Sequence, residues 1–324
     1  MVANCPDSDD SSMSLTESVK DYPIEFGRRY HAYRAGSVTA YAFPNDNYEL
    51  ERLTFQYDIL TALFSGRLFF APLTKASPPR RILDIGTGTG KWAIQMGDYF
   101  PETEIIATDL SPVQPEEVPP NVNFFVEDSS EPWDYTQPFD YIHTRVTAGC
   151  WSCFKTQVAQ QAFDSLSPGG WLESQEFDSY VACDDGTVPE NSHLSAYLRT
   201  LAEAAAQMDR PMKLACHLRS IYEEVGFVDV HERIFKIPTN GWPRDERLKE
   251  LGKNWELNLR QGLSGFSYNL YHRAFGRTAV ETELSLVDVR REISDPRMHA
   301  YMPIYVVWGR KPFPGEPVPN RTTS

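Results

Sequence analysis

A glycine-rich turn is the part of this sequence whose residue types and spacing most clearly suggest chemistry. It contains Asp84, Gly86, Thr87, Gly88 and Gly90. Alternate glycines let the backbone turn sharply and approach a ligand closely, and their G-x-G-x-G spacing differs from the G-x-G-x-x-G of dinucleotide-binding turns. The acid before the turn would oppose an anion and attract a cation. The turn therefore predicts S-adenosylmethionine (SAM), which carries an ammonium and a sulfonium, with NAD(P) as the alternative from the motif alone.

Two further carboxylates follow the next two predicted strands. Asp109 could accept hydrogen bonds from both ribose hydroxyls of an adenosyl group. Asp128 could accept one from the adenine amino group, with Leu110 and Ser129 flanking the base. Each acid taken singly is also explained as a helix cap or a solvated turn residue. Three acids at successive strand ends, on the edge where open sheets bind ligands, favour one shared cofactor site.

Three polar residues near the ends of later predicted strands are candidates for catalysis. His143 could act as a base or orient the methionine carboxylate of SAM, or it could be a half-buried structural histidine. Arg145 could bind that carboxylate or an acidic substrate, or bridge to a nearby acid. Glu176 could contact a substrate amine or cap a helix. The group that SAM usually donates is its methyl group. Methyl transfer mainly requires a correctly held acceptor and the exclusion of water, so no fixed catalytic motif is expected.

The elements that would position these residues alternate between strand and helix. Apolar runs bounded by turn residues predict buried strands, and apolar residues at helical spacing predict the helices between them. The strands are expected at 81–85, 105–108, 123–126, 139–143 and 170–175, with helices at 93–100 and 158–166. This alternation with short turns is typical of a doubly wound parallel α/β sheet.

The chain on either side of this core is predicted to be largely helical. Apolar spacing predicts a helix from Leu50 to Leu63, with Asp46 or Asn47 as its cap. A capping box of Thr278 and Glu281 predicts a helix that ends near residue 293. The other elements expected after the core are helices at 192–208, 213–225 and 245–263 and strands at 228–237 and 301–309.

This order of elements suggests five segments. They are a disordered start (1–20), an N-terminal helical lid (21–77), a SAM-binding core (78–177), a helical cap with the last strands (178–312) and a flexible tail (313–324). In the layout usual for such folds, residues 178–283 would carry the substrate pocket, with Trp242, Trp255, Phe266, Tyr268, Tyr271 and His272 as candidate walls. For Trp255 and Leu259, ordinary helical core spacing favours packing instead.

Several longer runs resemble class I SAM-dependent methyltransferases, and among them the fungal LaeA-like family. The matching runs are RRYHAYRAG (28–36), YAFPND (41–46), DLSPVQPEEVPPNV (109–122), EPW (131–133), FDYIHTR (139–145) and HAYMPIYVVWGRKP (299–312). The sequence departs from the family where Gln56-Tyr57 replaces the usual Gln-His. The resemblance spans residues 26 to 312.

This resemblance implies a seven-stranded Rossmann-like sheet with an N-terminal lid and an inserted helical cap. It also implies SAM as methyl donor, a fungal origin, and Tyr30, Tyr33 and Tyr41 in a lid over the cofactor. Tyr33 is accordingly expected among the cofactor-binding residues; the alternative is that these tyrosines pack the first helix on the sheet. Members of the family are either pathway enzymes that methylate natural products or regulators of secondary metabolism.

Composition narrows the choice of partners. A net charge of −14 opposes binding to nucleic acid, and the sequence has neither a membrane-length apolar run nor a signal pattern. Cys150 and Cys153 form a lone CxxC, so no metal site is expected. A cytoplasmic enzyme acting on a small-molecule acceptor is the leading hypothesis. The alternatives are a nuclear regulator that works with velvet-family partners, against which no Lys/Arg-rich nuclear signal is present, and a SAM-binding fold that catalyses another step such as a cyclisation.

Overall fold

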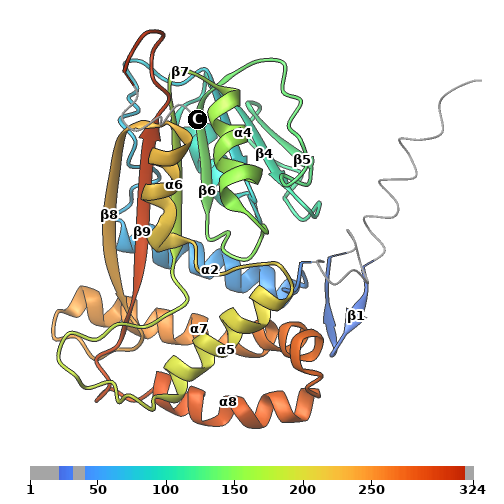
Figure 1. The fold of residues 1–324 in the computed structure, drawn as a ribbon, viewed down its shortest axis with the longest axis vertical. Coiled ribbons are helices and arrows are strands. Elements are labelled where there is room, and N and C mark those ends of the chain that lie inside the picture. The colour runs from blue at the N-terminus through green and yellow to red at the C-terminus, as the bar shows by residue number, and fades with distance from the viewer. Residues whose placement is uncertain (1–21, 32–40, 318–324) are drawn as a thin grey trace, which may run out of the picture.

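The computed structural model describes residues 22–31 and 41–317, and a seven-stranded sheet forms its centre (Figure 1). The strand order is β5-β4-β3-β6-β7-β9-β8, in which β3 to β7 run parallel and β9 is antiparallel to both of its neighbours. The strands are β3 (Arg81–Ile85), β4 (Glu104–Asp109), β5 (Val122–Val126), β6 (Phe139–Arg145), β7 (Leu166–Phe177), β8 (Val228–Pro238) and β9 (Tyr301–Arg310). The predicted doubly wound α/β sheet is confirmed.

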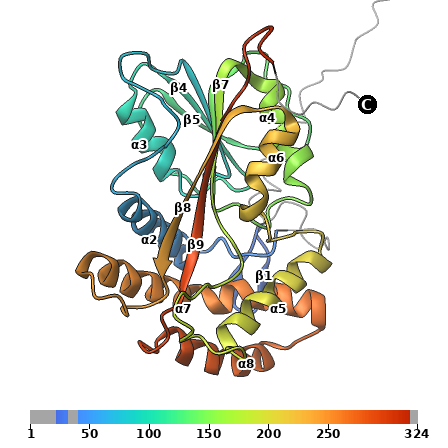
Figure 2. The ribbon, with the colours of Figure 1, turned by 60° about the vertical axis from the view of Figure 1, so that its left-hand side comes forward.

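Helices cover both faces of this sheet because neighbouring strand residues point to opposite sides. On β3, Ile82 packs toward α3 (Lys91–Tyr99), whereas Leu83 packs toward the side of α4 (Gln160–Ser165) and α6 (Leu218–Val225). Figure 2 shows α3 on one side of the sheet and α4 and α6 on the other. Strands β4 and β5 are added on one side of β3, and β6 is added on its other side. A crevice is therefore expected where the order reverses, at the carboxyl ends of these strands.

A second layer of helices lies beyond the carboxyl ends of the parallel strands (Figures 1 and 2). It consists of α2 (Asn47–Leu63), α5 (His193–Gln207), α7 (Glu246–Phe275) and α8 (Ala279–Ile293). Helix α7 packs against the other three, so the predicted N-terminal lid and the predicted cap meet in one layer. Asp46 caps α2, and the capping box of Thr278 and Glu281 opens α8, as the sequence predicts.

Helix α7 continues twelve residues beyond its predicted end at Leu263. Gly262 and Gly265 discourage a helix on propensity, but the local packing favours small residues there, since a Cβ on Gly262 would lie 2.4 Å from the Phe266 ring. A Cβ on Gly265 would come within 3.1 Å of the Arg28 side chain and 3.4 Å of Pro44. The helix ends instead at Gly276, whose φ of +67° is the left-handed conformation usual after a helix.

Smaller differences from the predicted elements occur at several positions. The helix expected at 158–166 begins with a π-helical turn, η1 (Lys155–Ala159), and the one expected at 213–225 begins with a 3₁₀ turn, η2 (Ala215–His217). A short hairpin, β1 (Ile24–Glu25) and β2 (Arg28–Arg29), was not predicted. Within the residues that the structure describes, no helix has both the length and the apolar character needed to cross a membrane.

Candidate cofactor and methyl-acceptor site

One cavity of about 250 Å³ extends from the carboxyl ends of β3, β4 and β6 into the helical layer. Its sheet end is formed by the glycine turn and by the residues that follow β4, β5 and β6. Its helical end, which we call the chamber, is formed mainly by apolar side chains of α2, α5 and α7. They include Leu53, Leu60, Leu194, Tyr197, Leu198, Leu201, Trp255, Leu259, Leu263 and Phe266. The cavity therefore joins the predicted cofactor turn to an apolar compartment.

The glycine turn at the sheet end requires residues without a Cβ. Gly86 and Gly88 have φ values of +68° and +57°, and both line the cavity. Thr87 lines it too, and the Gly88 N–H donates to Asp109 Oδ2 at 2.8 Å. Gly90 does not line the cavity. It begins α3, where a Cβ would lie 2.5 Å from the Phe124 ring, so packing against β5 explains this glycine.

Asp109 sits at the end of β4 with its carboxylate directed at the glycine turn. Besides the Gly88 N–H, it accepts a hydrogen bond from the Ser111 N–H at 3.1 Å. Burial raises the pKa of Asp109 to about 6, although backbone N–H groups of Gly88, Ser111 and Leu110 oppose this rise. Leu110 also lines the cavity. A desolvated carboxylate here is suited to hydrogen-bond donors such as hydroxyls.

Asp128 and Ser129 follow β5 and line the same end of the cavity. Asp128 Oδ1 accepts hydrogen bonds from the backbone and the hydroxyl of Ser130, at 2.9 and 2.6 Å. Ser129 Oγ accepts one from Trp151 Nε1 at 3.0 Å. The three predicted acids, at positions 84, 109 and 128, thus share one cavity, as expected for the edge of an open sheet; their individual contacts to a cofactor stay a prediction.

Asp84 has a partner that the sequence analysis did not foresee. Its Oδ1 lies 2.8 Å from Nδ1 of His143, its neighbour on β6. The His143 ring stacks on Trp92 with 3.8 Å between centroids and 5° between planes. Burial lowers the pKa of His143 and outweighs the hydrogen bond to Asp84, so the imidazole is neutral and Nδ1 is the donor. In the described part of the chain, Nε2 of His143 has no hydrogen-bond partner.

Arg145 ends β6 and lines the cavity near Asp84 and α2. Its guanidinium lies over the rings of Tyr57 and Phe64, with 5.1 and 5.9 Å to their centroids, and Nη2 donates to the Leu68 carbonyl at 3.3 Å. Among the described residues, Nε and Nη1 have no hydrogen-bond acceptor. Burial lowers the pKa of Arg145. Unpaired donors on a buried cation are costly, so an anionic ligand group would stabilise this arrangement.

The structure gives Glu176 a role different from the predicted contact with a substrate. Glu176 is fully buried and does not line the cavity. Its carboxylate accepts hydrogen bonds from the backbone and hydroxyl of Thr147 and from the Ala148 N–H. Burial raises the pKa of Glu176 to about 7, against these hydrogen bonds. Because both oxygens are occupied, Glu176 holds the loop after β6 against the glycine turn; Thr147 Cγ2 is 3.2 Å from where a Cβ of Gly86 would lie.

The tyrosines expected in a lid have different positions. Tyr33 lies outside the described residues. Tyr30 is 1% exposed and pairs with Pro44 rather than lining the cavity, whereas Tyr41 does line it. Hydrogen bonds connect the residues before α2 to the loop after β4, because Ser111 Oγ is hydrogen-bonded to both His31 and Asn45.

Some of the residues predicted to line the substrate pocket line the cavity, and others do not. Trp255, Leu259 and Phe266 line the chamber, so core spacing did not exclude a place on the cavity wall. The expectation is wrong for the others, which the cavity does not reach: Trp242 stacks on His299, Tyr268 donates to Glu283, and Tyr271 and His272 pack near Phe275 and Phe26.

A polar cluster on the chamber wall was missed by the sequence analysis. It consists of Glu49, Arg52 and Gln56 of α2 and Asn258 of α7, and all four line the cavity. Apolar spacing suggested that α2 buries Leu50 and Leu53, but the structure buries Glu49, Arg52 and Gln56 more completely. The signal was present as the spacing of three and four residues within Glu49–Arg52–Gln56, which places them on one face of the helix.

The fold and this cavity define a class I methyltransferase. The sheet has the order of that class, and the glycine turn and the acids at the carboxyl ends of β3, β4 and β5 line one cavity. Residues 55–232 match the family described as "Methyltransferase domain". Methyltransferase pytC of Aspergillus terreus is 38% identical over 95% of this chain and 93% of its own length. The probable methyltransferase tdiE of Emericella nidulans is 35% identical over 94% and 93%. The secondary metabolism regulator LAE1 of Cochliobolus heterostrophus is 34% identical over 89% and 94%.

The chain therefore belongs to the methyltransferase family that includes these fungal LaeA-like proteins, and its cofactor is SAM. The donor set fits this cofactor, since the turn offers space beside Gly88, where an added Cβ would meet no atom within 4 Å, and three carboxylates face the cavity. The NAD(P) alternative that the motif alone allowed is set aside.

Proposed function

We propose that this enzyme methylates a small molecule bound in the chamber between α2, α5 and α7. The observation that carries the proposal is the single cavity that leads from the glycine turn into this apolar compartment. An acceptor in the chamber would be enclosed by helices on several sides, which keeps water away from the reacting atoms. The relatives named methyltransferase pytC and tdiE support an enzymatic role, and the net charge of −14 argues against a nucleic-acid acceptor.

At the sheet end, the same residues that the sequence predicts are proposed to hold the cofactor. Asp109 would accept hydrogen bonds from the ribose, and Asp128 would accept one from the adenine amino group. Leu110 and Ser129 would flank the base, and Gly86, Thr87 and Gly88 would let the backbone approach. When bound, SAM supplies a methyl group on a positively charged sulfur.

At the end of β6, the two buried nitrogen-bearing side chains have separate proposed roles. Arg145 would bind the methionine carboxylate of the cofactor, because its Nε and Nη1 have no acceptor among the described residues. His143 would act as a base or orienting group through Nε2, with Asp84 fixing its Nδ1–H tautomer. Glu176 is proposed as a positioning residue for the loop after β6.

The first test is a calorimetric titration of the purified protein with SAM and, separately, with NADH. We expect SAM to bind with micromolar affinity and NADH not to bind. Binding of NADH without SAM would overturn the assignment. The second test incubates the protein with SAM carrying a labelled methyl group and an extract of low-molecular-mass metabolites. Label in a metabolite is the expected result, whereas label confined to protein would contradict a small-molecule acceptor.

A regulator that works with velvet-family partners is the second candidate, since LAE1 and several laeA proteins are among the relatives. Its test is retention by a velvet-family protein in a pull-down without turnover of any metabolite. Such a result would also favour a nuclear over the proposed cytoplasmic location. A SAM-binding catalyst of another reaction, such as a cyclisation, would convert a metabolite without transferring the label.

A further inference from the structure

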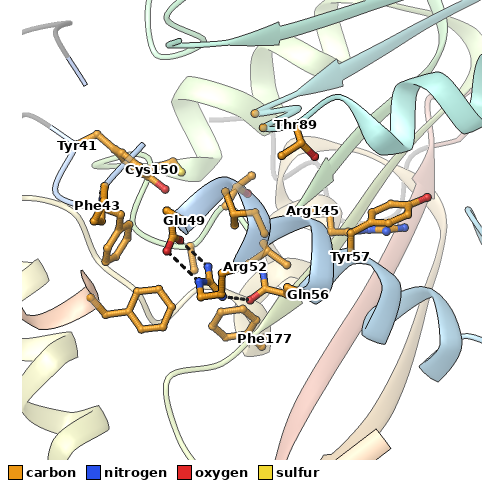
Figure 3. A pocket seen from close by; sticks show the side chains of 18 of the residues that line it. Tyr41, Phe43, Glu49, Arg52, Gln56, Tyr57, Thr89, Arg145, Cys150 and Phe177 are labelled. Carbon is orange, nitrogen blue, oxygen red and sulfur yellow. Dashed lines mark hydrogen bonds and ion pairs between the residues drawn. The ribbon is translucent and has the colours of Figure 1, made fainter. Parts of the chain in front are cut away.

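The polar cluster on the chamber wall is a hydrogen-bonded network inside a mainly apolar compartment. Glu49, Arg52, Gln56 and Asn258 are between 1% and 5% exposed. They belong to α2 and α7, which are distant in sequence, and Figure 3 shows Arg52 between Glu49 and Gln56. The Arg52 guanidinium also lies over the Phe266 ring, 4.8 Å from its centroid. Polar side chains this deeply buried are normally retained only when their partners satisfy them.

The charges in this network cancel within it. Both carboxylate oxygens of Glu49 accept from Arg52, from Nε at 2.9 Å and from Nη2 at 2.6 Å. This two-point pairing is the strongest geometry available to an arginine and a carboxylate. Neither charge is left to pair with a ligand, so the cluster offers no complement to a charged acceptor molecule.

The network also fixes which way the amide of Gln56 faces. Arg52 Nη1 donates to Gln56 Oε1 at 2.9 Å and to Asn258 Oδ1 at 2.8 Å. Because a guanidinium can only donate, both amide oxygens must be turned toward it. Asn258 Nδ2 then donates to the same Gln56 oxygen at 3.3 Å. The Gln56 nitrogen is therefore directed away from Arg52.

The Gln56 nitrogen carries two N–H donors, and neither has an acceptor in the described part of the chain. Every hydrogen bond of the Gln56 side chain goes to its oxygen, and Gln56 lines the cavity. Many of the side chains that line the chamber are apolar, including Leu53, Leu60 and Phe177. An oxygen acceptor on a bound molecule would satisfy these donors, which are costly to leave unpaired once water is displaced.

We propose that Gln56 is a specificity-determining residue that selects an uncharged, largely apolar acceptor molecule carrying a carbonyl or similar oxygen acceptor. This inference rests on the proposed function, because it assigns the substrate class of the same chamber. Glu49, Arg52 and Asn258 are positioning residues: they hold the amide in the orientation that presents its N–H groups. The methyl-accepting atom is a separate group of the molecule, nearer the glycine turn.

The test uses two neutral aromatic probes of nearly the same shape, 2-acetylnaphthalene and 2-isopropenylnaphthalene, which differ in the presence of a carbonyl oxygen. Their affinities are measured by tryptophan fluorescence with the cofactor site saturated with S-adenosylhomocysteine. We expect the wild-type protein to bind the ketone about fivefold more tightly, the effect of one net hydrogen bond. Gln56→Met, which keeps the side-chain length but removes the donors, is expected to bind both probes equally.

Leu53→Met is the matched control, because it alters a chamber residue one turn earlier on α2 without removing a donor. It should keep the preference for the ketone. Gln56→Glu is a second variant in case Gln56→Met does not fold, and it should also lose the preference, since a carboxylate has no N–H. Equal affinities in the wild-type protein, a preference that survives in a folded Gln56 variant, or no binding of either probe would overturn the inference. SAM affinity, measured in parallel, separates these outcomes from failure of the proposed function, in which wild type would not bind SAM.

Discussion

Among the residues of the site, Asp109 has the environment that most strongly indicates a role in cofactor binding. It is desolvated, accepts hydrogen bonds from Gly88 and Ser111, and faces the cavity at the end of β4. Ligand hydroxyls at such a group form charge-assisted hydrogen bonds, which are stronger than neutral ones. Two measurements can test its role independently, one of affinity and one of its dependence on pH.

Asp109→Ala is expected to weaken SAM binding by about 2–3 kcal/mol, the order of a charge-assisted hydrogen-bond pair. Calorimetric titration measures the change. Glu117→Ala is the control, because it removes the same charge from an exposed position on the loop after β4. Unchanged affinity in the Asp109 variant, or an equal loss in the control, would mean that the end of β4 does not hold the cofactor.

The affinity of the wild-type protein for SAM should fall as the pH is lowered through about 6. Burial raises the pKa of Asp109 to about 6, and only its ionised form accepts hydrogen bonds with both oxygens. Below this pH a proton must be displaced on binding, which costs about tenfold in affinity per pH unit. Titrations between pH 5 and 8 check this dependence. A profile that is equally steep in Asp109→Ala would assign the effect to another group.

The residue types of the site were predictable to different degrees. The glycine turn and the three acids were found because strand ends and glycine spacing are local signals, and all three acids line the cavity. The pairing of Asp84 with His143 was not predicted, since it depends on the register between β3 and β6. The hydrogen bonds of Glu173 were not predicted either. Its carboxylate accepts from the Phe70 and Ala71 N–H groups, which are about a hundred residues earlier in the sequence.

At the scale of elements, α7 illustrates why helix propensity alone fails here. Its Gly252 faces the turn after β8, where an added Cβ would lie 2.0 Å from the Asn240 carbonyl oxygen. Alanine is ordinarily favoured over glycine within a helix by about 1 kcal/mol. The close approach of backbone to backbone therefore decides which residue stands at position 252.

Gly252→Ala is accordingly expected to destabilise the protein by about 1–3 kcal/mol, the usual cost of overpacking, despite the gain in propensity. Chemical denaturation measures the free energy of unfolding. Glu250→Ala, two residues earlier on the exposed side of α7, should change it little. If Gly252→Ala were as stable as the wild type, the packing of α7 against this turn would be looser than the structure has it.

At the scale of the whole molecule, strand–helix alternation was sufficient to predict the α/β class and nearly all elements of the sheet. It was not sufficient to predict the chamber. The walls come from α2, α5 and α7, and the Arg52–Asn258 hydrogen bond joins residues 206 positions apart. Such pairings follow from the packing of the helical layer, for which helical periodicity gives a buried face but no partner. The polar cluster, which the further inference depends on, was missed for that reason.

The position of β9 in the sheet has a consequence for how the chain folds during synthesis. This strand is the last element that the structure describes. It nevertheless lies between β7 and β8, both of which precede it in sequence. A nascent polypeptide therefore leaves the ribosome with two unpaired strand edges until residues 301–310 emerge, and such edges invite pairing with other chains. We therefore expect products that terminate before residue 301 to aggregate more readily than chains that contain β9.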